Sequence, residues 1–291
     1  MLATVGAIAF SGKAIIVKLA YRHGVDAVML IMLRMLFALP FFLALAWWAG
    51  RPRNGVVPPR LGRRDWLGVI GLGISGYYLA SFLDFAGLAY ISASLERLIL
   101  YLNPTLVLLL GWLLYRRPVL RGQLLGMAVS YAGVVLVFGR ELHGAGGAAV
   151  WGATLVFASA VSYAVYLLFS GEMVRRLGSL RLVGLASTVA CLCCLLQFAV
   201  LRPWSSVLAV APPVLWLSLL NATACTVVPV LLVMMAVERI GAAMTAQSGM
   251  VGPVSTILLG VLLLGEPFTA WLAAGTLLVL AGIFIFSRAR A

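Results

Sequence analysis

The sequence has little charge, few acidic residues and almost no histidine. Charged residues make up 10% of its 291 residues, eight residues are acidic and two are histidines, whereas 64% are hydrophobic. A soluble domain is about half apolar and about a quarter charged. The shortage of charge therefore excludes an ordinary water-soluble enzyme, a disordered chain and a nucleic-acid-binding protein. It predicts a membrane protein whose charges lie in a few short loops.

Motifs of soluble catalysis are missing too. The sequence has no P-loop lysine motif, no His-Glu-x-x-His and no serine–histidine arrangement, so ATP-driven transport by this chain alone is excluded. A Gly-x-Gly-x-x-Gly match at residues 71–76 lies in an apolar run of transmembrane length, where small residues indicate close helix packing. The four cysteines predict neither a disulfide framework nor a metal site. We expect no cofactor, no metal and no enzyme, because a membrane enzyme would need a cluster of catalytic groups at one interface.

Long apolar runs fill nearly the whole chain. A helix that crosses a bilayer needs about 20 mainly apolar residues. Ten segments meet this requirement: residues 2–20, 27–49, 66–89, 92–114, 120–138, 149–170, 180–201, 212–236, 242–264 and 268–286. With ten spans, fourteen arginines lie in loops on one side and three on the other. Because basic loops favour the cytoplasm, we expect an all-α integral membrane protein with ten transmembrane helices and both termini cytoplasmic.

The second half of the sequence repeats the first at an offset of 149 residues. Residues 91–137 align without a gap on residues 240–286, and prolines and glycines keep their register, for example Pro104 with Pro253 and Gly126 with Gly275. The offset carries five spans, an odd number, so the halves are inverted. We expect two five-helix repeats, residues 1–139 and 149–287. Inverted repeats are typical of secondary transporters, whose substrate site lies near the midplane between the halves.

These segments also carry a resemblance to a known family. The relevant stretches are FSGKAIIVK with Lys18, MLRML with Arg34, NPTLVLLLGWLLYRRP (Asn103–Pro118) and GPVSTILLGVLLLGEP (Gly252–Pro267). The pattern resembles the EamA-type, ten-helix branch of the drug/metabolite transporter superfamily. The resemblance implies transport of small metabolites, in the export direction.

Two positions depart from the family pattern. Phe10-Ser11 stands where the family usually has Trp-Gly, and Arg117 replaces the common glutamate of the first repeat, whereas Glu266 keeps that of the second.

Six charged residues fall inside the expected spans: Lys13, Lys18, Arg34, Asp84, Glu96 and Arg97. A charge at the bilayer centre costs roughly 2.5–3.5 kcal/mol on insertion scales, so such residues usually face a cavity or a partner. Three interpretations are open: an ion-pair cluster that closes the outer mouth (with Lys18 reaching the interface), a gate or substrate-carboxylate site, or an interfacial accident.

Polar residues at helical spacing extend the candidate site. In the fourth span, Glu96 and Asn103 share one face, and Arg97 and Tyr101 share the neighbouring one. In the sixth, the face of Ser162, Tyr163 and Tyr166 suits either helix–helix hydrogen bonds or substrate contact. In the third span, Tyr77 and Tyr78 each suit a cavity wall or a lipid contact. The candidate substrate-binding or gating residues are Lys13, Arg34, Tyr78, Asp84, Glu96, Arg97, Tyr101, Asn103, Ser162, Tyr163, Tyr166, Asn221, Gln247 and Ser248.

Two functional hypotheses follow. The first is a secondary active transporter that exports small metabolites, amino acids or related zwitterions, by alternating access, with Glu96 and Asp84 as candidates for proton coupling. The alternative is an uncoupled facilitator or exchanger, in which Arg34 or Arg97 binds an anionic or phosphorylated metabolite. Both need only a small-molecule substrate and a lipid bilayer, with no nucleic acid, and leave the oligomeric state open. The excess of arginine over lysine suggests a bacterial inner membrane as the location.

Overall fold

The structure is a computed structural model of the chain. It describes residues 1–52, 59–116, 119–233, 235–236, 239 and 251–288. Within these ranges the fold is all-helical, and nine helical stretches are long and apolar enough to cross a membrane. The multi-pass membrane character expected from the composition is therefore confirmed for the described part of the chain.

The first half of the protein forms five helical stretches, of which three are single α-helices and two consist of consecutive helical segments. They are α1 (Leu2–Tyr21), α2 (Ala27–Ala49), α3 (Arg63–Gly73) continued by the π-helical turn η1 (Ile74–Leu79) into α4 (Ala80–Leu88), α5 (Ala93–Leu100) followed by α6 (Asn103–Tyr115), and α7 (Arg121–Ala145). Asp26 caps α2 by accepting a hydrogen bond from the Met29 N–H at 2.9 Å.

The second half contains α8, α9, α10, α12 and α13 among the described residues. Its elements are α8 (Gly147–Leu177), α9 (Ser179–Leu201), the 3₁₀ turn η2 (Trp204–Ala209), α10 (Pro212–Ala222) with the π-helical η3 (Thr223–Val227), α12 (Val251–Leu259) with the π-helical η4 (Gly260–Leu264), and α13 (Ala270–Arg288). The helix α8 is longer than the expected span 149–170 and ends at Leu177. Gly178 follows with a φ of 80°, a backbone conformation that residues with a β-carbon rarely adopt, and so it ends the helix.

Nine of the ten expected spans correspond to helices of the described residues. The expected span 242–264 is described only in its second part, as the shorter apolar helix Val251–Leu264. The number of ten spans and the side of the membrane on which the termini lie therefore stay predictions.

The break between α5 and α6 follows from one proline. Pro104 has no N–H, so the carbonyl of Leu100 loses its usual intrahelical partner. The side-chain amide of Asn103 donates to that carbonyl at 2.7 Å. Asn103 thus satisfies the group that the proline frees, and the chain continues as a second helix.

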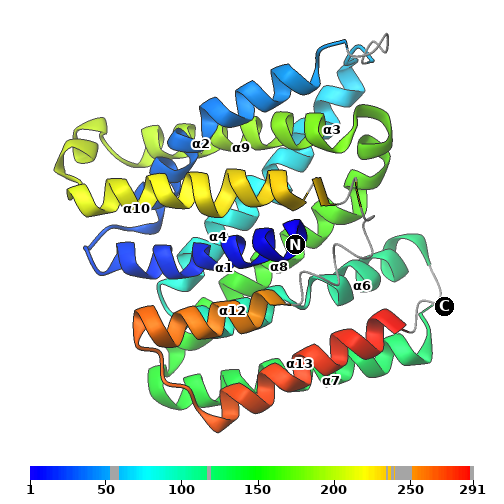
Figure 1. The fold of residues 1–291 in the computed structure, drawn as a ribbon, viewed down its shortest axis with the longest axis vertical. Coiled ribbons are helices and arrows are strands. Elements are labelled where there is room, and N and C mark those ends of the chain that lie inside the picture. The colour runs from blue at the N-terminus through cyan, green and yellow to red at the C-terminus, as the bar shows by residue number, and fades with distance from the viewer. Residues whose placement is uncertain (53–58, 117–118, 234, 237–238, 240–250, 289–291) are drawn as a thin grey trace.

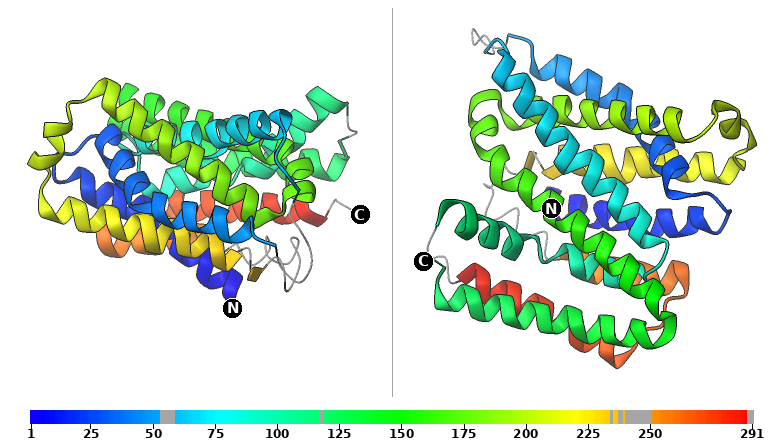
Figure 2. Two further views of the ribbon diagram at one scale, coloured as in Figure 1. Left: turned by 90° about the horizontal axis from the view of Figure 1, so that it is seen from above. Right: turned by 180° about the vertical axis from the view of Figure 1, so that it is seen from behind.

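The helices lie side by side, with α7 and α13 at one edge of the bundle and α2 and α3 at the opposite edge (Figures 1 and 2). A β-carbon on Gly126 would lie 2.6 Å from the carbonyl oxygen of Gly282, and one on Gly133 would lie 2.6 Å from that of Gly275. The backbones of α7 and α13 therefore touch, and because the contacts run in opposite residue order the two helices are antiparallel.

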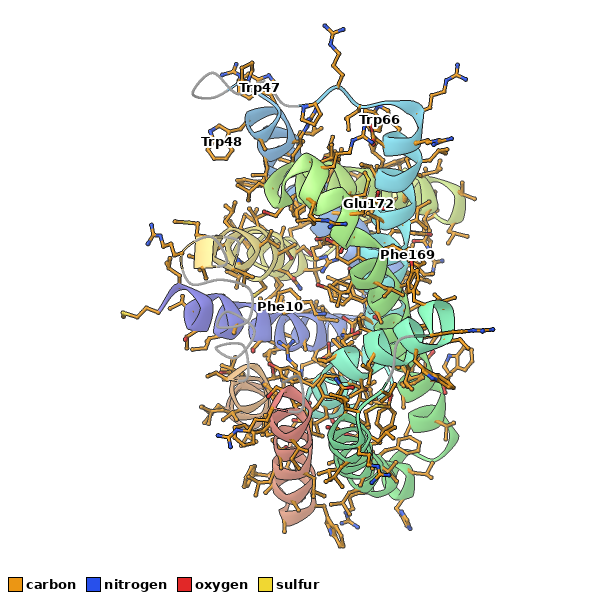
Figure 3. The ribbon with its side chains drawn as sticks, turned by 90° about the vertical axis from the view of Figure 1, so that its right-hand side faces the viewer. Phe10, Trp47, Trp48, Trp66, Phe169 and Glu172 are labelled. Atoms are coloured by element: carbon orange, nitrogen blue, oxygen red, sulfur yellow. The ribbon has the colours of Figure 1, made fainter. Side chains whose placement is uncertain are left out.

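We call the end of the bundle where α1 begins and α13 ends the proximal end, and the end where α1 stops and α5 begins the distal end (Figure 1). Trp47, Trp48 and Trp66 lie at the rim of the proximal end (Figure 3). Tryptophan is enriched at membrane interfaces, and the guanidinium of Arg51 lies 3.3 Å from the centre of the Trp47 ring. The proximal end therefore has the side chains of a membrane–water boundary.

Candidate substrate site

A cavity of about 400 Å³ lies between the two halves of the protein. The first half contributes wall residues from α1, α2, η1, α4, α5 and α6, and the second half contributes them from α8, α9, η3 and α12. The lining extends toward the proximal end as far as Gly6 of α1 and Val183 of α9. Its charged residues, Lys13, Arg34, Asp84 and Arg97, are buried and lie toward the distal side.

Lys13 sits between two carboxylates. Its Nζ atom lies 2.5 Å from Asp84 Oδ2 and 3.6 Å from Glu96 Oε1. Glu96 is fully buried behind the cavity wall, whereas Asp84 reaches the cavity itself. Asp84 Oδ1 and both oxygens of Glu96 have no hydrogen-bond partner among the described residues. One ammonium group is therefore shared between two carboxylates, and carboxylate oxygens remain that can accept further hydrogen bonds.

Arg97 points into the cavity from α5. Its Nε donates to Thr256 Oγ1 of α12 at 2.8 Å, which ties the two halves together beside the cavity. Its Nη2 finds no hydrogen-bond partner in the part of the chain that the structure describes. The Phe10 ring lies between two cations, with Arg97 Cζ 5.5 Å and Lys13 Nζ 5.4 Å from its centre. Phe10, which stands where the family usually has tryptophan, therefore contributes cation–π contacts to the cavity wall.

Arg34 is the most isolated cation of the wall. Its side chain is buried, and its guanidinium carbon lies 4.6 Å from the centre of the Phe85 ring. Within the described ranges no carboxylate lies within 4.0 Å of it, and its Nε has no hydrogen-bond partner there. Counting Lys13 and Arg97 as well, three cations face two carboxylates among the described residues, which gives the cluster a formal charge of +1.

Gly252 of α12 is the point where three helices meet beside the cavity. Ser11 of α1 donates to its carbonyl oxygen at 3.0 Å, and the Thr256 hydroxyl donates to the same oxygen at 3.1 Å. The Tyr101 hydroxyl lies directly against Gly252. Any side chain at this position would displace the tyrosine, so the glycine allows α5 and α12 to approach. Ser11, the second residue of the unusual Phe10-Ser11 pair, here links α1 to α12.

The serines and tyrosines of α8 face the π-helical turn of the third span. Ser159 and Ser162 donate to the carbonyl oxygens of Ala80 and Ser75 at 2.6 and 2.7 Å, so Ser162 makes a helix–helix hydrogen bond. Tyr163 lines the cavity and stacks on Tyr166, with ring centres 5.5 Å apart. Tyr166 is itself outside the lining, and its hydroxyl lies 3.1 Å from that of Tyr77, which does line the cavity.

The structure thus brings together Lys13, Arg34, Asp84, Arg97, Tyr101, Asn103 and Tyr163 in one cavity wall, with Glu96, Ser162 and Tyr166 directly behind it. Asn221 is fully buried in α10 and is outside the lining; neither polar atom of its side chain is hydrogen-bonded within the described residues. Gln247 and Ser248 lie outside the described residues.

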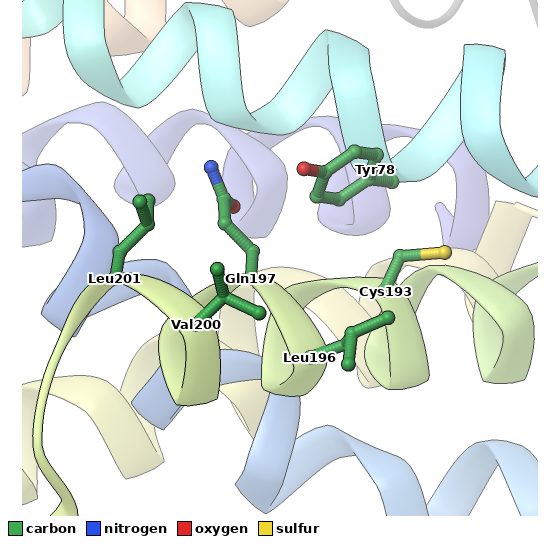
Figure 4. Close-up of a pocket in the computed structure, with 6 residues that line it drawn as sticks. All are labelled: Tyr78, Cys193, Leu196, Gln197, Val200 and Leu201. Carbon is green, nitrogen blue, oxygen red and sulfur yellow. The ribbon is translucent and has the colours of Figure 1, made fainter.

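Tyr78 lies elsewhere. It faces α9 and lines a separate hollow of about 420 Å³ on the side of the bundle, together with Cys193, Leu196, Gln197, Val200 and Leu201 (Figure 4). The wall of this hollow is almost entirely apolar, so a lipid-facing position suits it. Its neighbour Tyr77 belongs to the cavity instead.

Sequence reasoning also missed several residues of the wall. Tyr77, which the sequence allowed either on a cavity wall or against lipid, lines the cavity but was not among the candidates, and neither were Ser81, Ser187 and Thr226, which line it too. The last three are single small polar residues in apolar spans, and such residues form no periodic stripe. The only available signal was their polarity, which structural helix–helix contacts share.

Comparison with known proteins identifies the kind of activity. The model of the EamA-like transporter family matches residues 1–139 and again residues 150–288. The chain belongs to the EamA-like transporter family. The expected resemblance is therefore confirmed, and this EamA protein is a membrane transporter of the drug/metabolite type.

Relatives of this EamA protein carry consistent names. An uncharacterized transporter, YcbK of Bacillus subtilis (strain 168), is 30% identical over 90% of this chain and 84% of its own length. An uncharacterized transporter of Archaeoglobus fulgidus is 25% identical over 81% of this chain and 82% of its own length. A solved crystal structure of a protein at 20% identity has a TM-score of 0.64, covering 98% of this chain and 94% of that one, which shows that the fold is shared.

Proposed function

We propose that this EamA-family transporter exports small zwitterionic metabolites, amino acids or close analogues, by alternating access through the cavity between its two halves. The observation that carries the proposal is a set of buried polar atoms that belong to residues of the cavity wall and lack hydrogen-bond partners within the described residues. The donors are Arg97 Nη2 and Arg34 Nε, and the acceptors are Asp84 Oδ1 and Asn103 Oδ1.

A buried polar atom without a partner costs about 1–3 kcal/mol, and more when it is charged. A ligand that supplies both a carboxylate and an ammonium group removes this cost at both kinds of atom. The carboxylate fits the arginine donors, and the ammonium fits the carboxylate and amide oxygens. A simple amine or a simple carboxylate would satisfy only one kind.

The proposal assigns residues 1–139 and 149–287 to two inverted halves. The contacts between α7 and α13 support it. The offset of 149 converts Gly126 into Gly275 and Gly133 into Gly282, so the contact Gly126–Gly282 becomes Gly275–Gly133, which is the other observed contact. Between these two glycine contacts, the Ser130 hydroxyl donates to the carbonyl oxygen of Val279 at 3.5 Å. Val279 is the residue to which the offset of 149 relates Ser130. Halves related in this way can exchange conformations and open the cavity to either side in turn.

Orientation and direction are part of the same proposal. The arginine-rich loops lie at the proximal end, so this end faces the cytoplasm of a bacterial cell. The cavity extends toward the proximal end, which suits loading from the cytoplasm and release on the other side of the inner membrane.

Proton coupling is proposed for the carboxylate pair. Since Lys13 neutralises only one negative charge, the second carboxylate of Asp84 and Glu96 is available for a proton or for the substrate ammonium. Glu96→Gln is expected to abolish the pH dependence of transport in proteoliposomes, and unchanged pH dependence would remove Glu96 from this role.

The alternative is an uncoupled exchanger for anionic or phosphorylated metabolites, which the formal charge of +1 on the wall cluster favours. Counterflow in proteoliposomes separates the two. Vesicles are preloaded with one unlabelled compound, and uptake of its labelled form is followed without a pH gradient. The compounds are neutral amino acids, the matching carboxylates without the amino group, the matching amines without the carboxyl group, and small phosphorylated metabolites.

Counterflow of amino acids alone supports the proposal. Equal or faster counterflow of the carboxylates or of the phosphorylated compounds would establish the alternative. Movement of the amines alone would contradict both, because it would show that the arginines bind no part of the substrate.

A further inference from the structure

The N-terminus of α5, at the distal end, is held by two glutamates from other parts of the chain. Glu141 at the end of α7 accepts hydrogen bonds from the N–H of Ser92 at 3.1 Å and from the Ser92 hydroxyl. Glu266, which follows η4, accepts from the N–H of Ala93 at 2.7 Å and from the N–H and hydroxyl of Ser94 at 3.3 and 2.6 Å. Five donors of one helix start are thus bound by two carboxylates.

This arrangement is favourable for a physical reason. The first N–H groups of a helix have no partner within the helix, and the helix dipole places positive potential at its start. Hydrogen bonds to a carboxylate are also about twice as strong as neutral ones. Each glutamate therefore stabilises the position of α5 within the bundle.

The two glutamates differ in what they connect. Glu141 and α5 both belong to the first half, whereas Glu266 belongs to the second half and reaches across to the first. Gly265 has a φ of 71°, a left-handed conformation that turns the chain at the end of η4 directly before Glu266. The neighbouring carbonyl of Leu264 accepts a hydrogen bond at 2.7 Å from Arg22, which directly follows α1, and this is a second contact between the halves at this end.

The helix start that Glu266 holds leads directly into the candidate site. Glu96 and Arg97 lie in the first turn and a half of α5, and Tyr101 follows at its end. No residue of the distal helix ends, such as Tyr21 or Ser92, lines the cavity in the described ranges. Glu266 therefore holds the start of the helix that carries the charged wall, at the end of the bundle where no described helix end lines the cavity.

The internal repeat makes this contact one-sided. The offset of 149 relates Glu266 to Arg117, and Ser92-Ala93-Ser94 to the Gly-Ala-Ala of residues 241–243. These counterparts have no carboxylate and no hydroxyl. The sequence therefore supplies the cross-half contact for one end of the transporter and not for the other.

We propose that Glu266 is a positioning residue that latches the start of α5 to the second half, holds the distal end closed, and so favours the conformation whose cavity faces the proximal end. This inference rests on the proposed alternating access. When the distal end opens, the Glu266 hydrogen bonds break, while those of Glu141 move with the first half and persist.

The test is a labelling experiment in vesicles. Ala93 is fully buried beneath the latch, and Ala93→Cys provides a thiol there while its backbone N–H is kept. Reaction with a membrane-impermeant maleimide is followed in the Ala93→Cys protein alone and combined with Glu266→Gln or Glu141→Gln. The protein with only its four native cysteines gives the background. Because labelling needs no substrate, its outcome is independent of which metabolites are transported.

Glu266→Gln is expected to raise the labelling rate about tenfold, since the variant weakens three charge-assisted hydrogen bonds. The matched control Glu141→Gln removes a carboxylate from the same helix start and is expected to lower thermal stability without raising the labelling rate. Glu266→Asp, which keeps the charge on a shorter side chain, is expected to label at an intermediate rate.

Equal acceleration by Glu266→Gln and Glu141→Gln would show local fraying of α5 and overturn the proposal. An unchanged rate in Glu266→Gln would overturn it as well. If Glu266→Gln does not yield folded protein, Ser94→Ala takes its place. This variant removes one of the three Glu266 hydrogen bonds, and a labelling rate equal to that of the parent would again contradict the latch.

Discussion

The ion pair between Lys13 and Asp84 allows a quantitative prediction. In Lys13→Met, Asp84 and Glu96 stay buried, with 2% and 0% of their surfaces exposed, and lose the only ammonium group within 4.0 Å of them among the described residues. Removing one partner of a buried ion pair costs about 3–5 kcal/mol, whereas replacing both partners by neutral groups is often nearly neutral.

We therefore expect Lys13→Met to lower the melting temperature of the purified protein by roughly 6–15 °C, on the basis of about 2–3 °C per kcal/mol for a chain of this size. The double variant Lys13→Met with Asp84→Asn should recover most of that loss. Lys18→Met is the matched control on the same helix, because no carboxylate lies within 4.0 Å of Lys18 in the described residues. It should change the melting temperature by only a few degrees.

The assay is thermal unfolding of the parent protein, the three single variants Lys13→Met, Asp84→Asn and Lys18→Met, and the double variant in the same detergent, followed by loss of the monodisperse peak in size-exclusion chromatography. The reasoning is refuted if the effects of Lys13→Met and Asp84→Asn simply add in the double variant. It is also refuted if Lys18→Met destabilises as much as Lys13→Met, since the loss would then reflect helix packing and not the buried charge.

Three further predictions concern binding, packing and topology. Arg97→Gln should raise the KM for transported amino acids about 10–100-fold in proteoliposomes, because a charged hydrogen bond is worth about 1.5–3 kcal/mol, and an unchanged KM would place the substrate carboxylate elsewhere. Gly133→Ala should destabilise the protein by about 1–3 kcal/mol, since its β-carbon would lie 2.6 Å from a backbone oxygen, whereas Gly139→Ala on the same helix meets nothing within 4 Å and should have no such effect in thermal unfolding. A reporter enzyme fused after Ala291 should be active only in the cytoplasm, and periplasmic activity would reverse the orientation.

The sequence predicted those features of the fold that depend on neighbouring residues in the chain. Apolar runs of bilayer length predicted nine helical stretches of the described residues, because each span must satisfy the bilayer by its own composition. The ends were less well predicted, since α7 and α8 continue seven residues beyond the expected ends 138 and 170. The Asn103-Pro104 pair is a local signal of the same kind for the break between α5 and α6, since proline acts on its own turn.

The candidate site was only partly accessible to the same reasoning. Helical periodicity grouped Arg97 with Tyr101, but it could not decide which of Tyr77 and Tyr78 faces the cavity. The π-helical turn η1 changes the helical phase at these two residues, so the usual period of 3.6 residues gives no face there.

The sequence alone determined that this chain lies in a membrane, where its helices run, and that its second half repeats its first. These are properties of composition and spacing, and they can be derived without knowing which helices are in contact. Only the tertiary structure decided that Lys13 meets Asp84, 71 residues away, and that Glu266 reaches the start of α5, more than 170 residues away. The reason is physical: a charge buried in an apolar bundle requires a partner, but its position along the chain does not say which helix will bring that partner.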